Sequence, residues 1–355
     1  MSDTEPPAVQ RSTGSLIERR KPLLWPRDRD FRILSIDGGG IKGIFPAAVL
    51  AGIETRFLGG KSIAQYFDLI AGTSTGGIIA LGLGAGLSAQ AALDLYLKYG
   101  GSIFPTRGGR FFGGLIRVLR QARQFATYAY EREPLEALLH EALRERLLGD
   151  SQHRLNIPAF EGRHSEVYIY KTPHHPDFIS DAQQKMTTVA LATSAAPTFF
   201  RALPNDGYVM VDGGLWANNP MMIALVDALS CFDVDRNRVS ILSIGCGAEP
   251  FNVTHKLASG GIYHWRKVIS AAMHLQSLNA LGQARLLIGA ERVLRLEPPM
   301  FTPPINLDDY MRSKALLPGA AKTTVEMFVE AIAEKFLYGK VDPYIPVMAS
   351  NAVQS

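Results

Sequence analysis

The sequence Asp68-Leu-Ile-Ala-Gly-Thr-Ser-Thr-Gly-Gly77 contains the pattern Gly72-x-Ser74-x-Gly76. An apolar, strand-like run precedes this pattern, and a helix-like segment follows it. A serine in a sharp turn between a strand and a helix is typical of a nucleophile elbow. Glycine is needed on both sides, because larger side chains would collide with the neighbouring backbone. The following helix also points its N-terminus at the serine, which favours developing negative charge. We therefore interpret Ser74 as a candidate nucleophile in an α/β protein.

Strand-like and helix-like segments alternate outward from this turn. Apolar runs bounded by turn residues predict strands at Phe31–Ile36, Tyr66–Ala71, Glu166–Tyr170, Tyr208–Val211 and Val239–Ile244. Helical patterns cover Ile44–Phe57, Ala89–Tyr99, Glu131–Leu148, Ala320–Leu337 and most of Gly261–Arg292. Such alternation indicates βαβ units and a mainly parallel sheet covered by helices.

The composition limits the classes of protein that fit. The chain has 355 residues, 47% hydrophobic and 20% charged, which is enough apolar material for a sizeable core. A net charge of +4 is too small to indicate a nucleic-acid polymer as partner. Two cysteines, Cys231 and Cys246, exclude a disulfide scaffold and a multi-cysteine zinc module. We expect a single domain over residues 25–345, preceded by a flexible N-terminal tail at 1–24 and followed by a C-terminal tail at 346–355.

The membrane signals are weak. The N-terminal segment begins with the acids Asp3 and Glu5, contains proline and has no apolar run, so we expect no signal peptide. Residues 69–93 carry no charge and are long enough to span a bilayer. Their glycines instead favour a buried strand, a tight turn and a buried helix. We expect a cytoplasmic protein with transient, peripheral contact at the inner membrane.

A glycine-rich loop, Ser35-Ile-Asp-Gly-Gly-Gly-Ile-Lys-Gly43, follows the first predicted strand. Consecutive glycines let backbone N–H groups converge on an anion. Beside a nucleophilic serine, that anion is the oxyanion of a tetrahedral intermediate. The spacing also satisfies a dinucleotide-binding fingerprint, but the nearest acid, Glu54, lies inside a helical pattern rather than at a strand end. The fragment Gly60-Lys61-Ser62 lacks the first glycine of a phosphate-binding loop.

An aspartate motif supplies a candidate base. Tyr208-Val-Met-Val-Asp-Gly-Gly214 places Asp212 at the end of a predicted strand and before a glycine turn. A nucleophilic serine needs a base, and an aspartate serves when burial raises its pKa toward neutrality. No histidine lies in a context that resembles a triad. A Ser-His-Asp carboxylesterase is nevertheless kept as an alternative, with its histidine among His255, His264 and His274.

These motifs, in this order, resemble those of the patatin-like phospholipases over roughly residues 31–247. The matching blocks are the Asp37–Gly43 loop, Gly72-Thr-Ser-Thr-Gly76, Ala192–Phe200 and Asp212-Gly-Gly214. The resemblance implies a three-layer α/β fold, with a mainly parallel central sheet and helices on both faces. It also implies a lipid acyl hydrolase of phospholipase A type that needs no metal.

The resemblance further assigns roles to particular residues. It implies a dyad of Ser74 as nucleophile and Asp212 as base. The N–H groups that stabilise the oxyanion would come from Gly38, Gly39 and Gly40. Lys42 departs from the family, which more often has arginine at that position. Because lysine lacks the planar fork of arginine, a role in orienting substrate phosphate or the loop is an open hypothesis.

An acid-free interval between Asp94 and Glu131 interleaves arginine with aromatic and aliphatic residues. Within it, Arg117, Arg120 and Arg123 follow one another at helical spacing, opposite an apolar stripe. This pattern predicts an amphipathic helix that contacts anionic lipid. The alternative is an ordinary surface helix with a solvated arginine face.

The chain length and the single-domain layout resemble those of bacterial patatin effectors that cyclic nucleotides activate in antiphage defence. The resemblance implies a cyclic dinucleotide as activator, held in part by the region after Gly247. A purely structural role for the helix in Gly261–Arg292 is the alternative. A non-enzymatic nucleotide-binding regulator that uses the Gly38–Gly43 loop is the third possible function. The sequence does not indicate an oligomeric state.

Overall fold

The computed structural model describes residues 20–105, 129–247 and 268–347. Their centre is an eight-stranded sheet in the order β5-β6-β3-β2-β1-β7-β8, with β4 paired to β3. The strands are β1 (Phe31–Ile36), β2 (Leu69–Gly72), β3 (Arg154–Glu161), β4 (Glu166–Lys171), β5 (Leu203–Asn205), β6 (Tyr208–Asp212), β7 (Val239–Ile244) and β8 (Val293–Leu296). The strands β3, β2, β1, β7 and β8 run parallel to one another.

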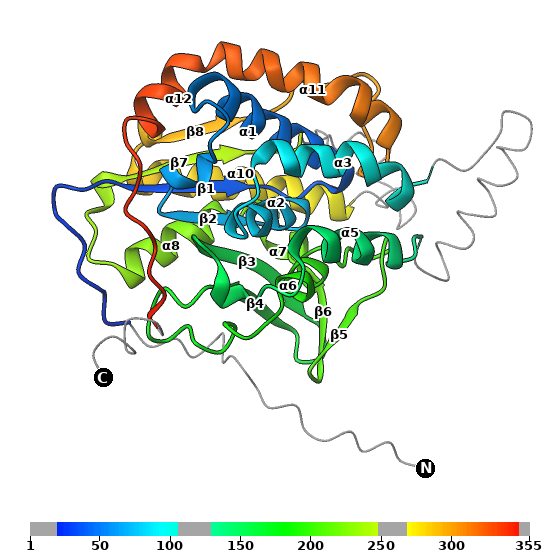
Figure 1. Cartoon of the computed structure of the whole chain (residues 1–355), viewed down its shortest axis with the longest axis horizontal. Helices are drawn as coiled ribbons and strands as arrows, with labels where there is room; N and C mark the ends of the chain where they lie inside the picture. The colour runs from blue at the N-terminus through cyan, green and yellow to red at the C-terminus, as the bar shows by residue number, and fades with distance from the viewer. Residues whose placement is uncertain (1–19, 106–128, 248–267, 348–355) are drawn as a thin grey trace, which may run out of the picture.

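Helices cover both faces of this sheet (Figure 1). Side chains of β1 alternate between the two faces, because successive residues of a strand point in opposite directions. Leu34 and Ile36 belong to one buried cluster, and Phe31 and Ile33 belong to the other. The first cluster includes α1 (Ile44–Phe57), α2 (Thr75–Gly84), α3 (Ala89–Ile103), α5 (Glu133–Leu143), α6 (Met186–Thr193), α11 (Tyr310–Met327) and α12 (Val329–Phe336). The second includes α8 (Met221–Cys231) and α10 (Val268–Ile288). The predicted three-layer α/β fold is confirmed.

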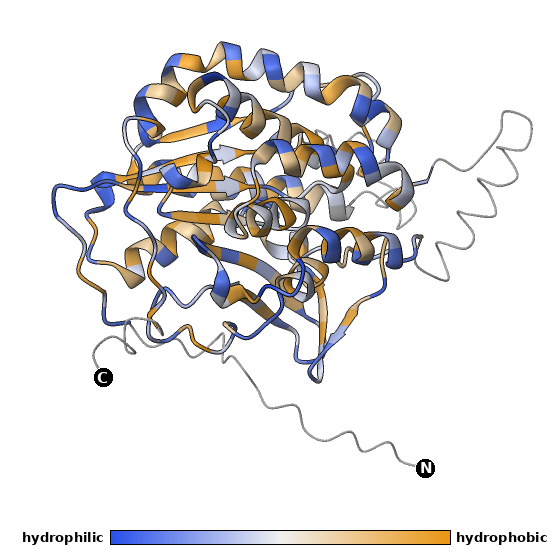
Figure 2. Cartoon of the chain, viewed as in Figure 1, coloured by the Kyte–Doolittle hydropathy of each residue, from blue (hydrophilic) through white to orange (hydrophobic). Residues whose placement is uncertain are grey.

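The colouring by hydropathy follows the same layers, with the strands of the sheet largely hydrophobic and the hydrophilic residues toward the outside (Figure 2). None of the helices within the described ranges combines the length and apolar character needed to cross a bilayer. Residues 69–93, which contain no charge, form β2, the turn at Ser74, α2 and the start of α3, as expected from their glycines.

The main differences between the observed and the predicted elements concern two helices and three strands. The helix predicted over Glu131–Leu148 is shorter, because Arg144 adopts a positive φ of 54° directly after α5. The helix predicted over Ala320–Leu337 is two helices, α11 and α12, separated at Phe328. The strands β3, β5 and β8 lie where no strand was predicted. The arginines Arg117, Arg120 and Arg123 lie outside the described residues.

Candidate active site

Two strands meet end to end along one edge of β3. On the opposite edge, β4 pairs continuously with residues 156–161 of β3. On the shared edge, β2 pairs with residues 154–156 and β6 pairs antiparallel with residues 159–161. The carboxyl ends of β2 and β6 therefore face each other across a gap at Ile157 and Pro158. This topology brings Ser74, just after β2, to Asp212, the last residue of β6.

Ser74 occupies a strained turn in this gap. Its φ of 54° and ψ of −121° lie in a region that residues with a side chain rarely adopt. Its Oγ donates a hydrogen bond of 2.6 Å to Oδ2 of Asp212. Both residues are buried, with exposed fractions of 9% and 5%. The structure thus brings together the two residues that the sequence analysis proposed as a dyad.

The glycines around Ser74 are there because the backbone leaves no room. A Cβ on Gly72 would lie 2.2 Å from the carbonyl oxygen of Gly76. A Cβ on Gly76 would lie 2.2 Å from the carbonyl oxygen of Ile36. These close approaches pack the turn against the end of β1 and fix the start of α2.

Thr193 supports the serine from α6, and the sequence analysis did not identify its role. Its buried hydroxyl accepts a hydrogen bond of 3.0 Å from the Ser74 N–H and donates one of 2.6 Å to the carbonyl oxygen of Pro158. The N and O atoms of one strand residue point to the same side of the strand. The nitrogen of Pro158, which carries no hydrogen, therefore also faces the gap, where no strand needs it as a donor. A proline is tolerated inside β3 for that reason.

Burial sets the basicity of Asp212. Removal from water raises the pKa of its carboxyl to about 6, against the opposing effect of two hydrogen bonds. One comes from Ser74, and the other comes from the Gly214 N–H to Oδ1 at 2.6 Å. A carboxylate with a pKa near neutrality is a stronger base than an exposed aspartate.

The glycine loop presents two free donors rather than three. Gly38 departs from the prediction, because its N–H already donates a hydrogen bond of 3.0 Å to the carbonyl oxygen of Asn218. Gly39 and Gly40 line the same cavity as Ser74. Among the described residues, the N–H groups of Gly39 and Gly40 have no hydrogen-bond partner. An oxyanion hole at this loop therefore rests on Gly39 and Gly40.

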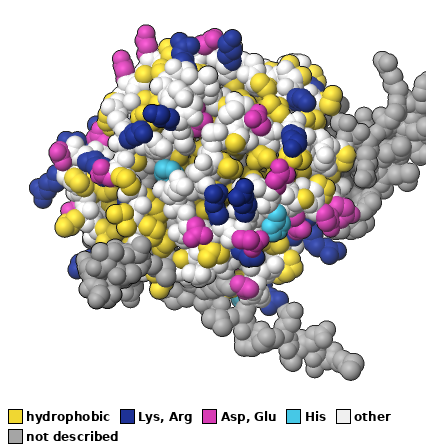
Figure 3. Space-filling model, in the orientation of Figure 1, with side chains coloured by type: hydrophobic (Ala, Val, Ile, Leu, Met, Phe, Trp, Pro, Cys, Tyr) yellow, Lys and Arg dark blue, Asp and Glu magenta, His cyan; other side chains and the backbone are white. Residues whose placement is uncertain are grey.

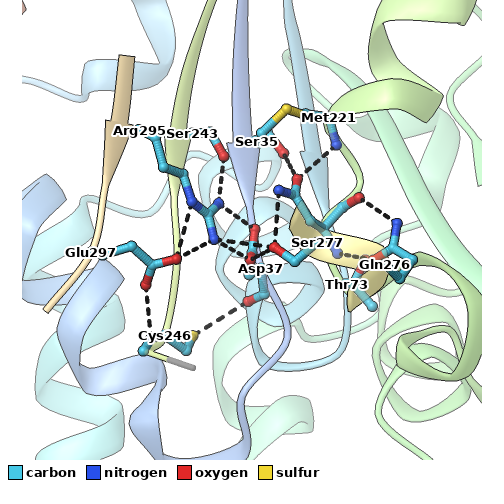
Figure 4. Close-up of polar contacts among 12 residues, drawn as sticks. Ser35, Asp37, Thr73, Met221, Ser243, Cys246, Gln276, Ser277, Arg295 and Glu297 are labelled. Carbon is cyan, nitrogen blue, oxygen red and sulfur yellow. Dashed lines mark hydrogen bonds and ion pairs between the residues drawn. The ribbon is translucent and has the colours of Figure 1, made fainter. Parts of the chain in front are cut away.

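A buried polar network holds the loop from behind (Figure 4). Arg295, on β8, donates to both carboxylate oxygens of Asp37, at 2.8 and 2.6 Å. Ser277, on α10, donates to the same carboxylate at 3.2 Å. Burial alone would lower the pKa of Arg295, but Asp37 and Glu297 outweigh it and raise that pKa. The guanidinium stays charged, and the network ties the residue before Gly38 to the C-terminal part of the sheet. The sequence offered no sign of this role for Arg295.

Lys42 lies against the far side of the loop. Its Nζ donates a hydrogen bond of 2.6 Å to the carbonyl oxygen of Gly247. Of the two roles considered for this side chain, this contact favours orientation of the loop.

Two cavities adjoin at the glycine loop. One, of about 280 Å³, contains Ser74 and Asp212 and is otherwise lined mainly by apolar side chains. The other, of about 290 Å³, is lined by charged and polar groups that include Lys42, His274, Arg295 and Glu297. Five residues line both cavities: Phe199, Asn218, Ser270, Met273 and Leu307. The Oδ1 atom of Asn218 is buried and has no hydrogen-bond partner among the described residues.

The described histidines do not complete a triad with Ser74. His274 lines the polar cavity and not the one that contains Ser74. His174 is buried elsewhere, with Nε2 at 2.7 Å from Asp227 and Nδ1 at 2.9 Å from the Thr172 hydroxyl. His255 and His264 lie outside the described residues. Within the described ranges, no group of three or more His, Cys, Asp or Glu side chains is placed to hold a metal ion.

An α/β fold with a serine at a strand-to-helix turn, hydrogen-bonded to a side chain that can act as its base, is the arrangement of serine acyl hydrolases. Residues 34–225 match the profile of the family described as patatin-like phospholipase, and the chain belongs to this family. The resemblance inferred from the sequence is confirmed.

Curated relatives agree with the family. A cGAMP-activated phospholipase of Escherichia coli is 37% identical over 64% of this chain and 65% of its own length. A cGAMP-activated phospholipase of Vibrio cholerae is 37% identical over 64% of this chain and 68% of its own. Patatin-like protein 2 of Arabidopsis thaliana is 32% identical over 66% of this chain and 64% of its own. The chain thus aligns with about two thirds of the length of these relatives.

Proposed function

We propose that this protein is a serine lipid acyl hydrolase of phospholipase A type, which cleaves acyl esters of membrane phospholipids. The observation that carries the proposal is the 2.6 Å hydrogen bond from Ser74 Oγ to Asp212, inside a cavity lined mainly by apolar side chains. The family assignment of residues 34–225 agrees with it. A buried nucleophile and base beside apolar side chains suit an ester whose acyl chain avoids water.

In the proposed mechanism, Ser74 Oγ attacks the ester carbonyl carbon while its proton passes to Asp212. The carbonyl oxygen becomes an oxyanion, which accepts hydrogen bonds from the N–H groups of Gly39 and Gly40. The bond to the leaving alcohol then breaks, and the alcohol oxygen takes the proton from Asp212. Water attacks the acyl-serine in the same way, with Asp212 accepting and then returning a proton to Ser74.

We also propose that a cyclic dinucleotide activates the enzyme. Two relatives at 37% identity are named cGAMP-activated phospholipases, and each match covers 64% of this chain. A gate is physically sensible, because an unregulated phospholipase would degrade the membranes of its own cell. Such regulation agrees with the resemblance to antiphage effectors.

Membrane contact through Arg117, Arg120 and Arg123 stays a prediction. On the face shown in Figure 3, Lys and Arg side chains are interspersed with Asp and Glu side chains. A mixed face attracts anionic lipid less than a basic one. Binding to anionic liposomes, and its loss in Arg117→Glu with Arg120→Glu, tests whether this acid-free segment supplies the attraction.

The decisive experiment combines a fluorophosphonate probe with a phospholipid panel. We expect the probe to label wild type and not Ser74→Ala, because only an activated serine reacts. We expect release of fatty acid from phospholipids to rise when a cyclic dinucleotide from a panel is added. Full phospholipase activity without nucleotide would contradict the proposed activation by a cyclic dinucleotide. A large loss in His274→Ala would favour a triad, and no labelling with retained nucleotide binding would favour a regulator without enzymatic activity.

A further inference from the structure

A smaller cavity, of about 30 Å³, adjoins the cavity that contains Ser74. Four side chains belong to the walls of both: Ile78, Tyr96, Ile103 and Leu135. The remaining wall of the smaller cavity is formed by Gly82, Leu87, Ala92, Leu95, Leu138, Leu139, Ala142 and Leu143. The two cavities are therefore neighbours across these four side chains, and together they mark a path that begins at the candidate nucleophile.

This path runs between three helices, α2, α3 and α5, which lie side by side in Figure 1. On α2, the residues that face it are Thr75, Ile78 and Gly82, three and four positions apart and hence on one side of the helix. At about 1.5 Å per helical residue, Gly82 lies ~10 Å along the axis from Thr75. The path thus leads directly away from Ser74 and into the protein.

The inner part of the path is hydrocarbon. Among the described residues that line it, the one polar side chain is Tyr96. Its hydroxyl donates a hydrogen bond of 3.1 Å to the Thr75 carbonyl oxygen and also contacts the Thr75 hydroxyl. The tyrosine ring is left to face the cavity. A cavity lined in this way holds water poorly and accepts an apolar ligand.

Gly82 differs from the other glycines of α2. A Cβ on Gly76, Gly77 or Gly84 would lie 2.2, 2.8 or 2.6 Å from its nearest neighbour, so close packing demands glycine there. A Cβ on Gly82 would find its nearest atom, Cδ1 of Leu87, at an ordinary 3.6 Å. Glycine destabilises a helix relative to alanine. Neither the packing nor the backbone of α2 requires glycine at this position. Because Gly82 has no side chain, the cavity has more room there.

We propose that the fatty-acyl chain of the substrate enters along α2 between α3 and α5, and that Gly82 sets the depth available to it. The proposal deepens the proposed hydrolase function and rests on it. A side chain at position 82 would shorten the longest acyl chain that the enzyme accepts, without touching Ser74 or Asp212.

The test compares Gly82→Ala and Gly82→Leu with wild type on p-nitrophenyl butyrate, octanoate and palmitate. We expect Gly82→Leu to keep butyrate turnover within about twofold of wild type. It should lower kcat/KM for palmitate by about tenfold or more, because the methylene groups that no longer fit in the cavity stay in water and contribute no binding energy. Gly82→Ala should fall between. Ala142→Phe, from the opposite wall on α5, should shift the profile in the same direction. The matched control is Gly282→Leu on α10, where a Cβ would meet nothing within 4 Å.

An unchanged chain-length profile in Gly82→Leu and Ala142→Phe would overturn the proposal, and so would an equal loss on all three esters by folded variants. Displacement of a fluorescent fatty acid from Ser74→Ala protein by octanoic or palmitic acid reads out the same path without hydrolysis. A fatty-acid affinity that the position 82 variants change, with no ester turnover by wild type either alone or with each cyclic dinucleotide of the panel, would contradict the hydrolase function alone. Turnover with no effect of position 82 in either assay would contradict the acyl path alone.

Discussion

The hydroxyl of Thr193 accepts a hydrogen bond of 3.0 Å from the backbone N–H of Ser74 and donates one of 2.6 Å to the carbonyl oxygen of Pro158. One side chain of α6 thereby connects the turn after β2 to the gap in β3. The strained backbone of Ser74 is held by this contact as well as by the flanking glycines.

Thr193→Val keeps the shape of the side chain and removes the hydroxyl. It leaves the Ser74 N–H and the Pro158 oxygen without a partner, each in a buried position. We expect a loss of ~1–3 kcal/mol in the free energy of unfolding and a fall in ester kcat. Denaturant unfolding and turnover measure the two effects. Thr193→Ser, which retains the hydroxyl, is the control, and a Val variant that matches wild type in both would show that the contact is dispensable.

The dyad predicts non-additive losses. Ser74→Ala removes the nucleophile and Asp212→Ala removes its base, so each should lower ester turnover by at least ~10³-fold. The double variant should be little worse than either single variant, because the two residues act as one unit. Most of the activity surviving in Asp212→Ala would exclude aspartate as the base and direct attention to the histidines.

Activity should rise with pH through about 6. Burial raises the pKa of Asp212 to about 6, and the base must be unprotonated to accept the proton of Ser74. The rate of fluorophosphonate labelling should therefore be half-maximal near that pH and level above it. Thermal melts across the same range separate this effect from unfolding. A labelling rate that is flat between pH 5 and 8 would argue against Asp212 as the titrating group.

Gly39→Ala tests the oxyanion loop. A Cβ there would lie 2.3 Å from the Cβ of Cys246, so the loop must shift, and the N–H of residue 39 would shift with it. We expect at least ~10²-fold lower turnover, the usual effect of a lost oxyanion donor, in a protein that still folds. Adding Cys246→Gly removes the clash and should restore part of the activity. A fully active Gly39→Ala protein would show that this loop is not the oxyanion hole.

Arg295→Lys tests the network behind the loop. Lysine keeps the charge but cannot donate to both oxygens of Asp37 as the guanidinium fork does. We expect ~1–3 kcal/mol lower stability and reduced turnover with little change in KM. Arg292→Lys is a matched control, because Arg292 is only half-buried and its ion pair with Glu291 is long, at 3.9 Å. Equal stability and turnover of the two variants would show that the network behind the loop does not contribute to catalysis.

Local chemistry made the core of the site predictable from the sequence. The glycines around Ser74 and after Asp37 predict that neighbouring atoms lie too close to the backbone for a side chain, and the structure contains these close contacts. The contribution of β6 was not predictable in the same way, because its antiparallel pairing with the far end of β3 is a tertiary property. Gly38 illustrates the limit: its N–H is used by Asn218, a residue far along the chain, and no local pattern reveals that. Thr193 and Arg295 are single residues in ordinary segments, and only packing shows what they contact.

The positive φ of Ser74 has a consequence for attempts to engineer this protein. A residue held in such a conformation costs about 1–3 kcal/mol, and glycine would adopt it without that penalty. Ser74→Gly should therefore melt at a higher temperature than Ser74→Ala. A selection for heat resistance alone would drive position 74 toward glycine, and the most robust descendants of this chain would be those that had lost their chemistry.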